Sequence, residues 1–204
     1  MKRLKLFMLV RMIVLGLITG VLVGCASSTP PSYEYLLVDS SSDEVNVIAT
    51  APMQIQMMPV EVANYLSGNE IVLVSKTGGV HRSQSHLWAE ALAPQLTRLT
   101  QQRLEKTLNN ISWYSRQRLP SYAIAQLNIE VDRFYADLQG GVNITGRWQL
   151  ISAEGKILNT QVFDVTDYLR SDGYSALTQT LASNWINQIV EPMAKQIAEA
   201  LNTP

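Results

Sequence analysis

The stretch AIAQLNIEVD, residues 123–132, decides the fold class, because apolar side chains at every second residue from Ala123 to Val131 alternate with polar ones from Gln126 to Asp132. A period of two puts successive side chains on opposite faces of a strand, so the segment predicts a strand with one dry and one solvated face. The alternation returns over residues 142–150, after the turn residues Gln139-Gly140-Gly141. With a further strand over residues 157–165, joined by a two-residue turn at Glu154-Gly155, the pattern predicts a three-stranded antiparallel meander.

Shorter strands are expected on the N-terminal side of this meander. Residues 33–38 (YEYLLV) and 71–74 (IVLV) are apolar runs of strand length, and residues 52–59 place Met53, Ile55 and Met57 on one face. Turn chemistry follows at Thr77-Gly78-Gly79, and a polar loop is expected over residues 40–44.

A first helix is expected to begin near Ser83 or Ser85, because either hydroxyl could cap its first turn. One apolar stripe at helical spacing comprises Trp88, Leu92, Leu96 and Leu99, and a second stripe on nearly the opposite side comprises Leu104, Leu108 and Ile111. Two explanations fit this pattern. Either the helix is buried on two sides, or its phase breaks near Gln101.

A second helix is expected over residues 174–201. Its two stripes, rotated by about a third of a turn, are Leu177, Leu181 and Trp185, then Ile186, Val190, Met193, Ile197 and Leu201. Pro192 cannot donate a hydrogen bond to the carbonyl of Gln188, so a kink or break is predicted there. The order of elements predicts one α+β domain over residues 33–204, with a mixed, largely antiparallel sheet and two helices packed on one face.

Residues 1–24 are typical of a lipoprotein signal peptide. The start Lys2-Arg3-Leu4-Lys5 is basic, and residues 12–23 form an apolar run of the length of a signal-peptide core. Arg11 shortens the uncharged stretch below the roughly 18 residues that a membrane span needs. The segment therefore predicts export and removal of a leader.

The leader ends in Leu22-Val23-Gly24-Cys25, which matches the bacterial lipobox. This motif predicts cleavage between Gly24 and Cys25 and acylation of the Cys25 thiol, with residues 25–32 as a lipidated, flexible tether. Two or three acyl chains, at about 0.8 kcal/mol per buried CH₂, make such an anchor effectively permanent. The alternative is an uncleaved membrane anchor in which Cys25 is buried and inert.

The residue after Cys25, the net charge and the cysteine count restrict where the protein can be located and what it can bind. Ala26, and not Asp, follows Cys25, which by the sorting rule of enteric lipoproteins predicts the outer membrane, with the body facing the periplasm. Without the leader, 12 basic residues face 17 acidic ones, a charge of −5, which disfavours nucleic acid as a partner. A single cysteine in the chain excludes an internal disulfide and a cysteine metal cage.

The search for reactive chemistry yields no catalytic residue, no cofactor and no metal site. His81, His86 and Glu90 come nearest to a metal cluster, but the preferred interpretation is two solvated histidines, one in a turn and one at a helix start. There is no nucleophile elbow and no phosphate-binding glycine loop.

The four tryptophans divide into two groups. Trp88, Trp148 and Trp185 lie on apolar stripes and are predicted to be core residues. Trp113-Tyr114 follows the first helix in an expected loop, and is therefore the candidate contact with a partner.

The order of features resembles the ABC-type transport auxiliary lipoproteins. The resemblance rests on the lipobox, on Tyr33-Glu34-Tyr35-Leu36-Leu37, on Val60 and Tyr65-Leu66 before Ile71-Val72, and on Leu87-Trp88-Ala89-Glu90-Ala91-Leu92 at the opening of a leucine-rich helix. It covers most of the chain after Cys25.

This resemblance implies a non-enzymatic lipoprotein of an MCE-type intermembrane lipid transport system. Such a protein would dock the MCE-domain tunnel protein, which works with an inner-membrane partner, to the outer membrane, and would contact phospholipid. A ring-shaped tunnel would suit a homo-oligomer. Two other hypotheses are kept: a lipoprotein cofactor of another envelope machine, such as a peptidoglycan synthase activator, and a lipid-modifying enzyme that would need His81 and His86.

Overall fold

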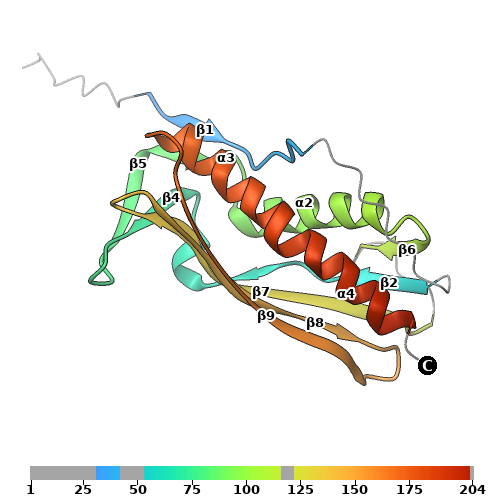
Figure 1. The fold of residues 1–204 in the computed structure, drawn as a ribbon. Coiled ribbons are helices and arrows are strands. Elements are labelled where there is room, and N and C mark those ends of the chain that lie inside the picture. Colours follow the sequence, from blue (N-terminus) through green and yellow to red (C-terminus); the bar gives the residue numbers. More distant parts are fainter. Residues whose placement is uncertain (1–30, 42–52, 116–121, 203–204) are drawn as a thin grey trace, which may run out of the picture. The chain divides into compact units, whose positions relative to one another are not determined.

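The computed structural model describes residues 31–41, 53–115 and 122–202. Within them nine strands form one mixed sheet, and two long helical stretches cover one of its faces (Figure 1), which confirms the predicted α+β fold. The strands are β1 (Tyr33–Tyr35), β2 (Met53–Met57), β3 (Glu61–Val62), β4 (Glu70–Val74), β5 (Val80–Trp88), β6 (Ile111–Tyr114), β7 (Ala125–Asp137), β8 (Gly141–Ile151) and β9 (Ile157–Tyr168). The helical elements are the 3-10 turn η1 (Asn64–Leu66), α2 (Leu92–Thr107), α3 (Tyr174–Asn184), the π turn η2 (Trp185–Val190) and α4 (Glu191–Asn202).

The long strand β7 organises the sheet. Along one edge it pairs with β8, and β8 pairs with β9, both antiparallel, which confirms the meander. Along its other edge β7 pairs in succession with β2, β3 and β4, all parallel. The β8–β9 turn is longer than the expected two residues: the Ser152 N–H donates to the Lys156 carbonyl, and Gly155 has a φ of 85°, which favours glycine.

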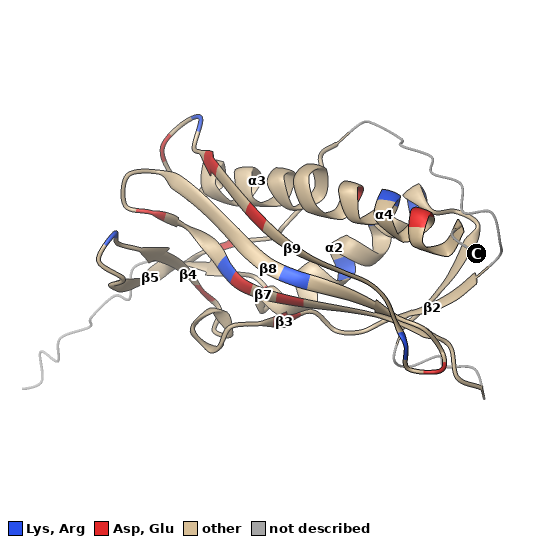
Figure 2. Ribbon diagram, turned by 60° about the horizontal axis from the view of Figure 1, so that its bottom comes forward, with Lys and Arg blue, Asp and Glu red and all other residues tan. Residues whose placement is uncertain are grey.

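The core lies between the sheet and the helices. Along β7, Ala125, Leu127, Ile129 and Val131 are at most 3% exposed. The opposite sheet face is seen in Figure 2, where acidic and basic residues are interspersed along β7, β8 and β9. The predicted core tryptophans, Trp88, Trp148 and Trp185, are all buried.

The first helix begins later than the sequence pattern predicts. Residues 83–88 belong to β5, and α2 starts at Leu92, so the expected start at Ser83 or Ser85 is wrong. β5 pairs with β4 on one side and β1 on the other, and this pairing outweighs the weak helical pattern of its residues. The Ser83 hydroxyl accepts a hydrogen bond from the His86 N–H at 2.9 Å, as a helix cap would, but within a strand.

Helix α2 runs past Gln101 without a break, so its two apolar stripes mark one wide buried face. Leu96 and Leu104 are both fully buried. The helix contacts β3 and β6 on one side and η2 and α4 on the other, which explains the width of this face. Ile111, counted with the second stripe, instead begins β6.

The π turn η2 explains the two stripes of the C-terminal helix. The Glu191 N–H donates to the Ile186 carbonyl, five residues back. A π turn holds about one residue more than an α turn, which rotates the next helix face by about 100°, close to the offset between the stripes. Trp185, the first residue of the turn, and Met193, in the helix after it, are therefore both buried. The irregularity predicted at Pro192 takes the form of this turn, which ends two residues before the proline.

Strand β7 runs from one end of the domain to the other, and its 13 residues at about 3.3 Å each span about 40 Å. The tether end holds Tyr33 and the β4–β5, β7–β8 and β9–α3 connections at residues 75–79, 138–140 and 169–173 (Figure 1, left). The distal end holds β6, the start of β2 and the β8–β9 turn (Figure 1, right).

Candidate functional site

The predicted lipidation site Cys25 and the cleavage position after Gly24 lie outside the described residues. No helix in the described part of the chain is both long and apolar enough to cross a membrane. The described chain starts at Pro31 and enters β1 at Tyr33. An anchor at Cys25 would therefore act on the domain through its tether end.

His81, His86 and Glu90 do not form a common site. Both histidines lie on β5, so their predicted places in a turn and at a helix start are wrong. The Glu90 carboxylate instead pairs with Arg98, 2.7 Å from its guanidinium. Within residues 31–41, 53–115 and 122–202, no group of three or more His, Cys, Asp or Glu side chains is arranged to hold a metal ion.

His86 belongs to a cluster of aromatic rings at the tether end. Its ring stacks on Tyr174, with centroids 3.9 Å apart, and on Tyr33, with centroids 5.3 Å apart. The Tyr35 hydroxyl and His86 Nδ1 are hydrogen-bonded at 2.9 Å. The rings join β1 to the start of α3, and so fix the point at which the chain enters the domain.

The candidate contact Trp113-Tyr114 lies in β6 rather than in the expected loop. β6 is an edge strand, and Trp113 pairs with Ile55 of β2, which in turn pairs with Ala125, the first residue of β7. Trp113 and Tyr114 are half-buried, and the buried indole N–H of Trp113 has no hydrogen-bond partner among the described residues. The pair therefore lies at the distal end.

A third aromatic side chain extends this surface. Tyr122 is 59% exposed, and its hydroxyl donates to Gln54 Oε1 at 2.6 Å. Gln54 pairs with Ser112, the neighbour of Trp113. We call Trp113, Tyr114 and Tyr122 the distal aromatic group; because successive strand residues point to opposite faces, it lies around the sheet edge rather than on one face. Aromatic rings with one polar atom are typical of protein contacts, because they bury much apolar area and keep a hydrogen-bonding group.

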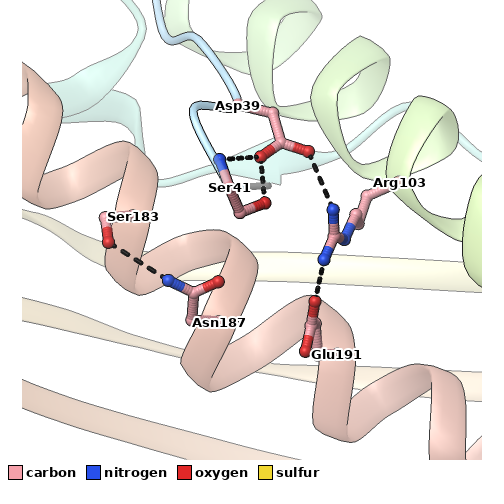
Figure 3. A network of polar contacts seen from close by, with 6 residues as sticks. All are labelled: Asp39, Ser41, Arg103, Ser183, Asn187 and Glu191. Atoms are coloured by element: carbon pink, nitrogen blue, oxygen red, sulfur yellow. Dashed lines mark hydrogen bonds and ion pairs between the residues drawn. The ribbon is translucent and has the colours of Figure 1, made fainter. Parts of the chain in front are cut away.

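The structure also shows an ion cluster that the sequence pattern does not predict (Figure 3). Arg103 of α2 is only 4% exposed, and its guanidinium donates to Asp39 at 3.4 Å and to Glu191 of α4. The other oxygen of Asp39 accepts a hydrogen bond from the Ser41 N–H at 2.9 Å. The partners are 64 and 88 residues from Arg103 in the chain. The one signal in the sequence is a basic residue between apolar positions of a buried helix face.

A polar hollow of about 400 Å³ lies beside this cluster, lined mainly by Asp39, Ser40, Ser41, Ser183, Asn187 and Glu191. Both carboxylates already accept hydrogen bonds from Arg103, and the Asn187 amide donates to the Ser183 hydroxyl at 3.2 Å. The Leu37 N–H also donates to Gln95 of α2 at 2.8 Å. We interpret the cluster as structural, because one guanidinium is hydrogen-bonded to both carboxylates and the cluster holds the segment after β1 on the helices.

Among the residues that the structure describes, three groups have pKa values displaced from their ordinary range. Burial raises the pKa of Tyr65 to about 12, and its hydroxyl donates to the Asp132 carbonyl. A hydrogen bond to Glu130 raises the pKa of Arg147, and a hydrogen bond from Ser152 lowers the pKa of Glu154. All three shifts favour the charge that the group already has near neutral pH. None of the three is an acid or base tuned for catalysis.

Comparison with known proteins gives relatives along almost the whole chain. The intermembrane transport lipoprotein PqiC of Escherichia coli strain K12 is 25% identical over 176 residues, which cover 86% of this chain and 91% of PqiC. PqiC of Shigella flexneri matches to the same extent.

Solved structures show the same fold. A crystal structure described only as that of an uncharacterized protein has a TM-score of 0.68 at 23% identity, covering 82% of this chain and 99% of that one. A crystal structure of a Xanthomonas campestris protein has a TM-score of 0.63 at 14% identity, covering 83% and 94% of the two chains.

The sequence profile described as ABC-type transport auxiliary lipoprotein component matches residues 35–198. The match begins at the last residue of β1 and ends in α4, so it takes in the whole meander, the parallel strands and both helical stretches. Because it extends over the complete architecture rather than one motif, the chain belongs to the ABC-type transport auxiliary lipoprotein family.

Proposed function

We propose that this lipoprotein is held in the outer membrane by acylated Cys25 and is a non-catalytic auxiliary component of an MCE-type intermembrane lipid transport system. In this role it docks the MCE-domain tunnel protein, which works with an inner-membrane partner, to the outer membrane. The observation that carries the proposal is the similarity to PqiC, an intermembrane transport lipoprotein, over 86% of the chain. A ring of copies around the tunnel and direct contact with phospholipid belong to the same proposal.

The geometry supports a docking role because it separates the anchor from the candidate partner surface. The tether enters at Tyr33, whereas the distal aromatic group lies level with the first residue of β7. The length of β7 separates the two ends by about 40 Å. A protein anchored at one end thus presents Trp113 and Tyr114 to a partner that approaches from the periplasm.

The partner can be identified by photocrosslinking in the native envelope. We replace Tyr114 by p-benzoylphenylalanine, and use the same replacement of Tyr168, an exposed tyrosine at the tether end, as the matched control. We expect an MCE-domain protein to be captured from position 114 and not from position 168. Capture of a peptidoglycan synthase from position 114 would instead support the cofactor hypothesis. Capture of the MCE-domain protein only from position 168 would refute docking through the distal end.

The anchor can be tested independently. Cys25→Ala should leave a precursor of full length that is absent from the outer membrane, because neither acylation nor cleavage can proceed. Ala26→Asp is the matched control: it should keep the acylated, cleaved form but move it to the inner-membrane fraction. Mass spectrometry of the two variants measures the modification, and membrane fractionation measures the location. A cleaved Cys25→Ala protein in the outer membrane would contradict the lipobox assignment.

The catalytic alternative has a test of its own. A lipid-modifying enzyme would depend on reactive side chains, and the notable histidine, His86, already stacks on two tyrosine rings and hydrogen-bonds Tyr35. We expect the double variant His81→Gln and His86→Gln to keep the wild-type resistance of cells to detergent. Loss of resistance with unchanged protein levels would favour the enzyme.

A further inference from the structure

We propose that the tether end is a membrane-contacting face, which rests on the surface of the phospholipid leaflet that holds the anchor. The inference depends on the proposed acylation of Cys25, and goes beyond it by assigning a lipid-contacting surface to the folded domain itself.

The register of the sheet brings apolar residues from separate connections to this end. Val80 pairs with Val74, and Val74 pairs with Asp137, the last residue of β7. Across the β7–β8 turn, Gly141 pairs with Tyr168 of β9. Val80 at the start of β5, Leu138 in the β7–β8 turn and Tyr168 at the end of β9 therefore lie at one end of the sheet.

These side chains are large, apolar and open to solvent. Val80 is 45% exposed, Leu138 is 50% exposed and Tyr168 is 73% exposed. Tyr33, the first residue of β1, is 57% exposed and stacks on His86, which stacks on Tyr174 at the start of α3. Single exposed apolar residues are common on soluble domains, but several gathered at one end indicate a surface that contacts something apolar.

A shallow apolar hollow adds to this surface. It has a volume of about 280 Å³ and lies between the β7–β8 turn and the β9–α3 loop, and its apolar lining residues are Leu73, Leu138, Leu169, Tyr174 and Leu177. Asp137 and Asp172 also line it, and the Asp137 carboxylate accepts hydrogen bonds from the Gln139 and Gly141 N–H groups. Two of the apolar lining residues stand at the loop tips and three belong to the strands and helix behind them. The tips can therefore enter the headgroup layer while the rigid sheet and α3 stay above it.

The short tether indicates that the tether end contacts the membrane rather than another partner. Residues 26–32 lie between Cys25 and β1, and seven extended residues reach at most about 25 Å. The acyl anchor therefore keeps the tether end close to the bilayer at all times, so even a weak surface contact is largely populated. Tyrosine is also enriched at the membrane–water boundary, where its ring lies at headgroup level.

The charges indicate that the contact is apolar rather than electrostatic. Arg170 and Asp172 share the β9–α3 connection, and Lys76 in the β4–β5 connection is matched in number by Asp137 at the end of β7. The chain after residue 24 has a charge of −5, which gives no attraction to anionic lipid. We therefore expect binding to a zwitterionic surface that does not depend on salt.

The test uses the full mature lipoprotein in zwitterionic phosphatidylcholine–phosphatidylethanolamine vesicles. Cys25 is the only cysteine of the chain, so acylation leaves no free thiol and one new cysteine can be labelled specifically. An environment-sensitive dye is attached to Leu138→Cys, and to Val162→Cys as the control, because Val162 is 80% exposed in the middle of β9. Quenching is measured with headgroup-level nitroxide lipids and with aqueous iodide, at low and high salt.

We expect nitroxide lipids to quench the dye at position 138 several-fold more than at position 162, and iodide to show the reverse order, with no change in high salt. Equal quenching at both positions would refute the proposed membrane-contacting face. It would not refute the acyl anchor, since an acylated protein would still float with the vesicles. Disappearance of the nitroxide quenching at position 138 in high salt would also refute the face, because the surface would then be electrostatic. Failure to float would refute the proposed acylation, and the face with it.

Discussion

Replacing Arg103 by Ala should destabilise the domain more than its position on a helix suggests. The guanidinium is 4% exposed, and the Asp39 and Glu191 side chains are only 17% and 15% exposed. Without Arg103, two largely buried carboxylates face each other with no cation between them. Breaking a buried ion cluster in this way costs about 3–5 kcal/mol. For a domain of this size each kcal/mol lowers the melting temperature by about 2–4 °C, so a fall of about 6–20 °C is expected.

The same helix provides the matched control. Arg98 pairs with Glu90 at 2.7 Å, but its side chain is 47% exposed, so Arg98→Ala should change the free energy of unfolding by no more than about 1 kcal/mol. Thermal and urea unfolding of the mature protein in detergent, followed by circular dichroism, measures both. A triple variant, Arg103→Met with Asp39→Asn and Glu191→Gln, should recover much of the loss because no uncompensated charge is left. Equal effects of Arg98→Ala and Arg103→Ala would refute the reasoning.

Three further predictions concern the stability of the domain. Trp88→Ala should cost about 3–5 kcal/mol of unfolding free energy, because a large ring that is 4% exposed is removed from the core; a change near zero in urea unfolding would place the ring outside it. Gly146→Ala should cost about 1–3 kcal/mol, since its Cβ would clash with the Glu130 carbonyl oxygen, and an unchanged urea midpoint would contradict this close approach. Tyr65 has a pKa raised from 10.0 to about 12, so its contribution to stability is complete below pH 10 and is lost as the pH rises toward 12. Tyr65→Phe should therefore flatten the fall of the urea midpoint over this range, and a slope identical to that of the wild type would show that Tyr65 does not cause it.

The meander and the one-sided core could be predicted because period-two alternation is a local property. In β7 and β8 each side chain faces either the helices or water, and the polarity of each residue indicates which face it lies on. The π turn also has a local signal in the sequence. The apolar stripe that ends at Trp185 and the stripe that begins at Ile186 are offset by an angle close to one residue of helix rotation. Because Pro192 lies close to this offset, the sequence predicts a proline kink there rather than a π turn.

The start of α2 and the ion cluster could not be predicted, because both depend on partners that are distant in the chain. Residues 83–88 form a strand because they pair with β1 and β4, and no local sequence pattern predicts this pairing. Arg103 is buried because Asp39 and Glu191 meet it from other elements. The sequence predicts a loop at Trp113 for the same reason: β6 has four residues and pairs only with β2, which precedes it by more than fifty residues.

The outer sheet face explains why contacts are expected at the ends of the domain. Glu130 and Arg147 lie directly opposite each other on β7 and β8, and their side chains form an ion pair that is about half exposed. A partner on this face would have to remove such charges from water, and each buried ion costs several kcal/mol unless new contacts replace its hydration. The two ends instead offer Trp113, Tyr122, Leu138 and Tyr168, whose burial gains free energy. If Cys25 is acylated as proposed, a domain with a charged face and apolar ends is therefore suited to bridge a membrane and a partner, one at each end.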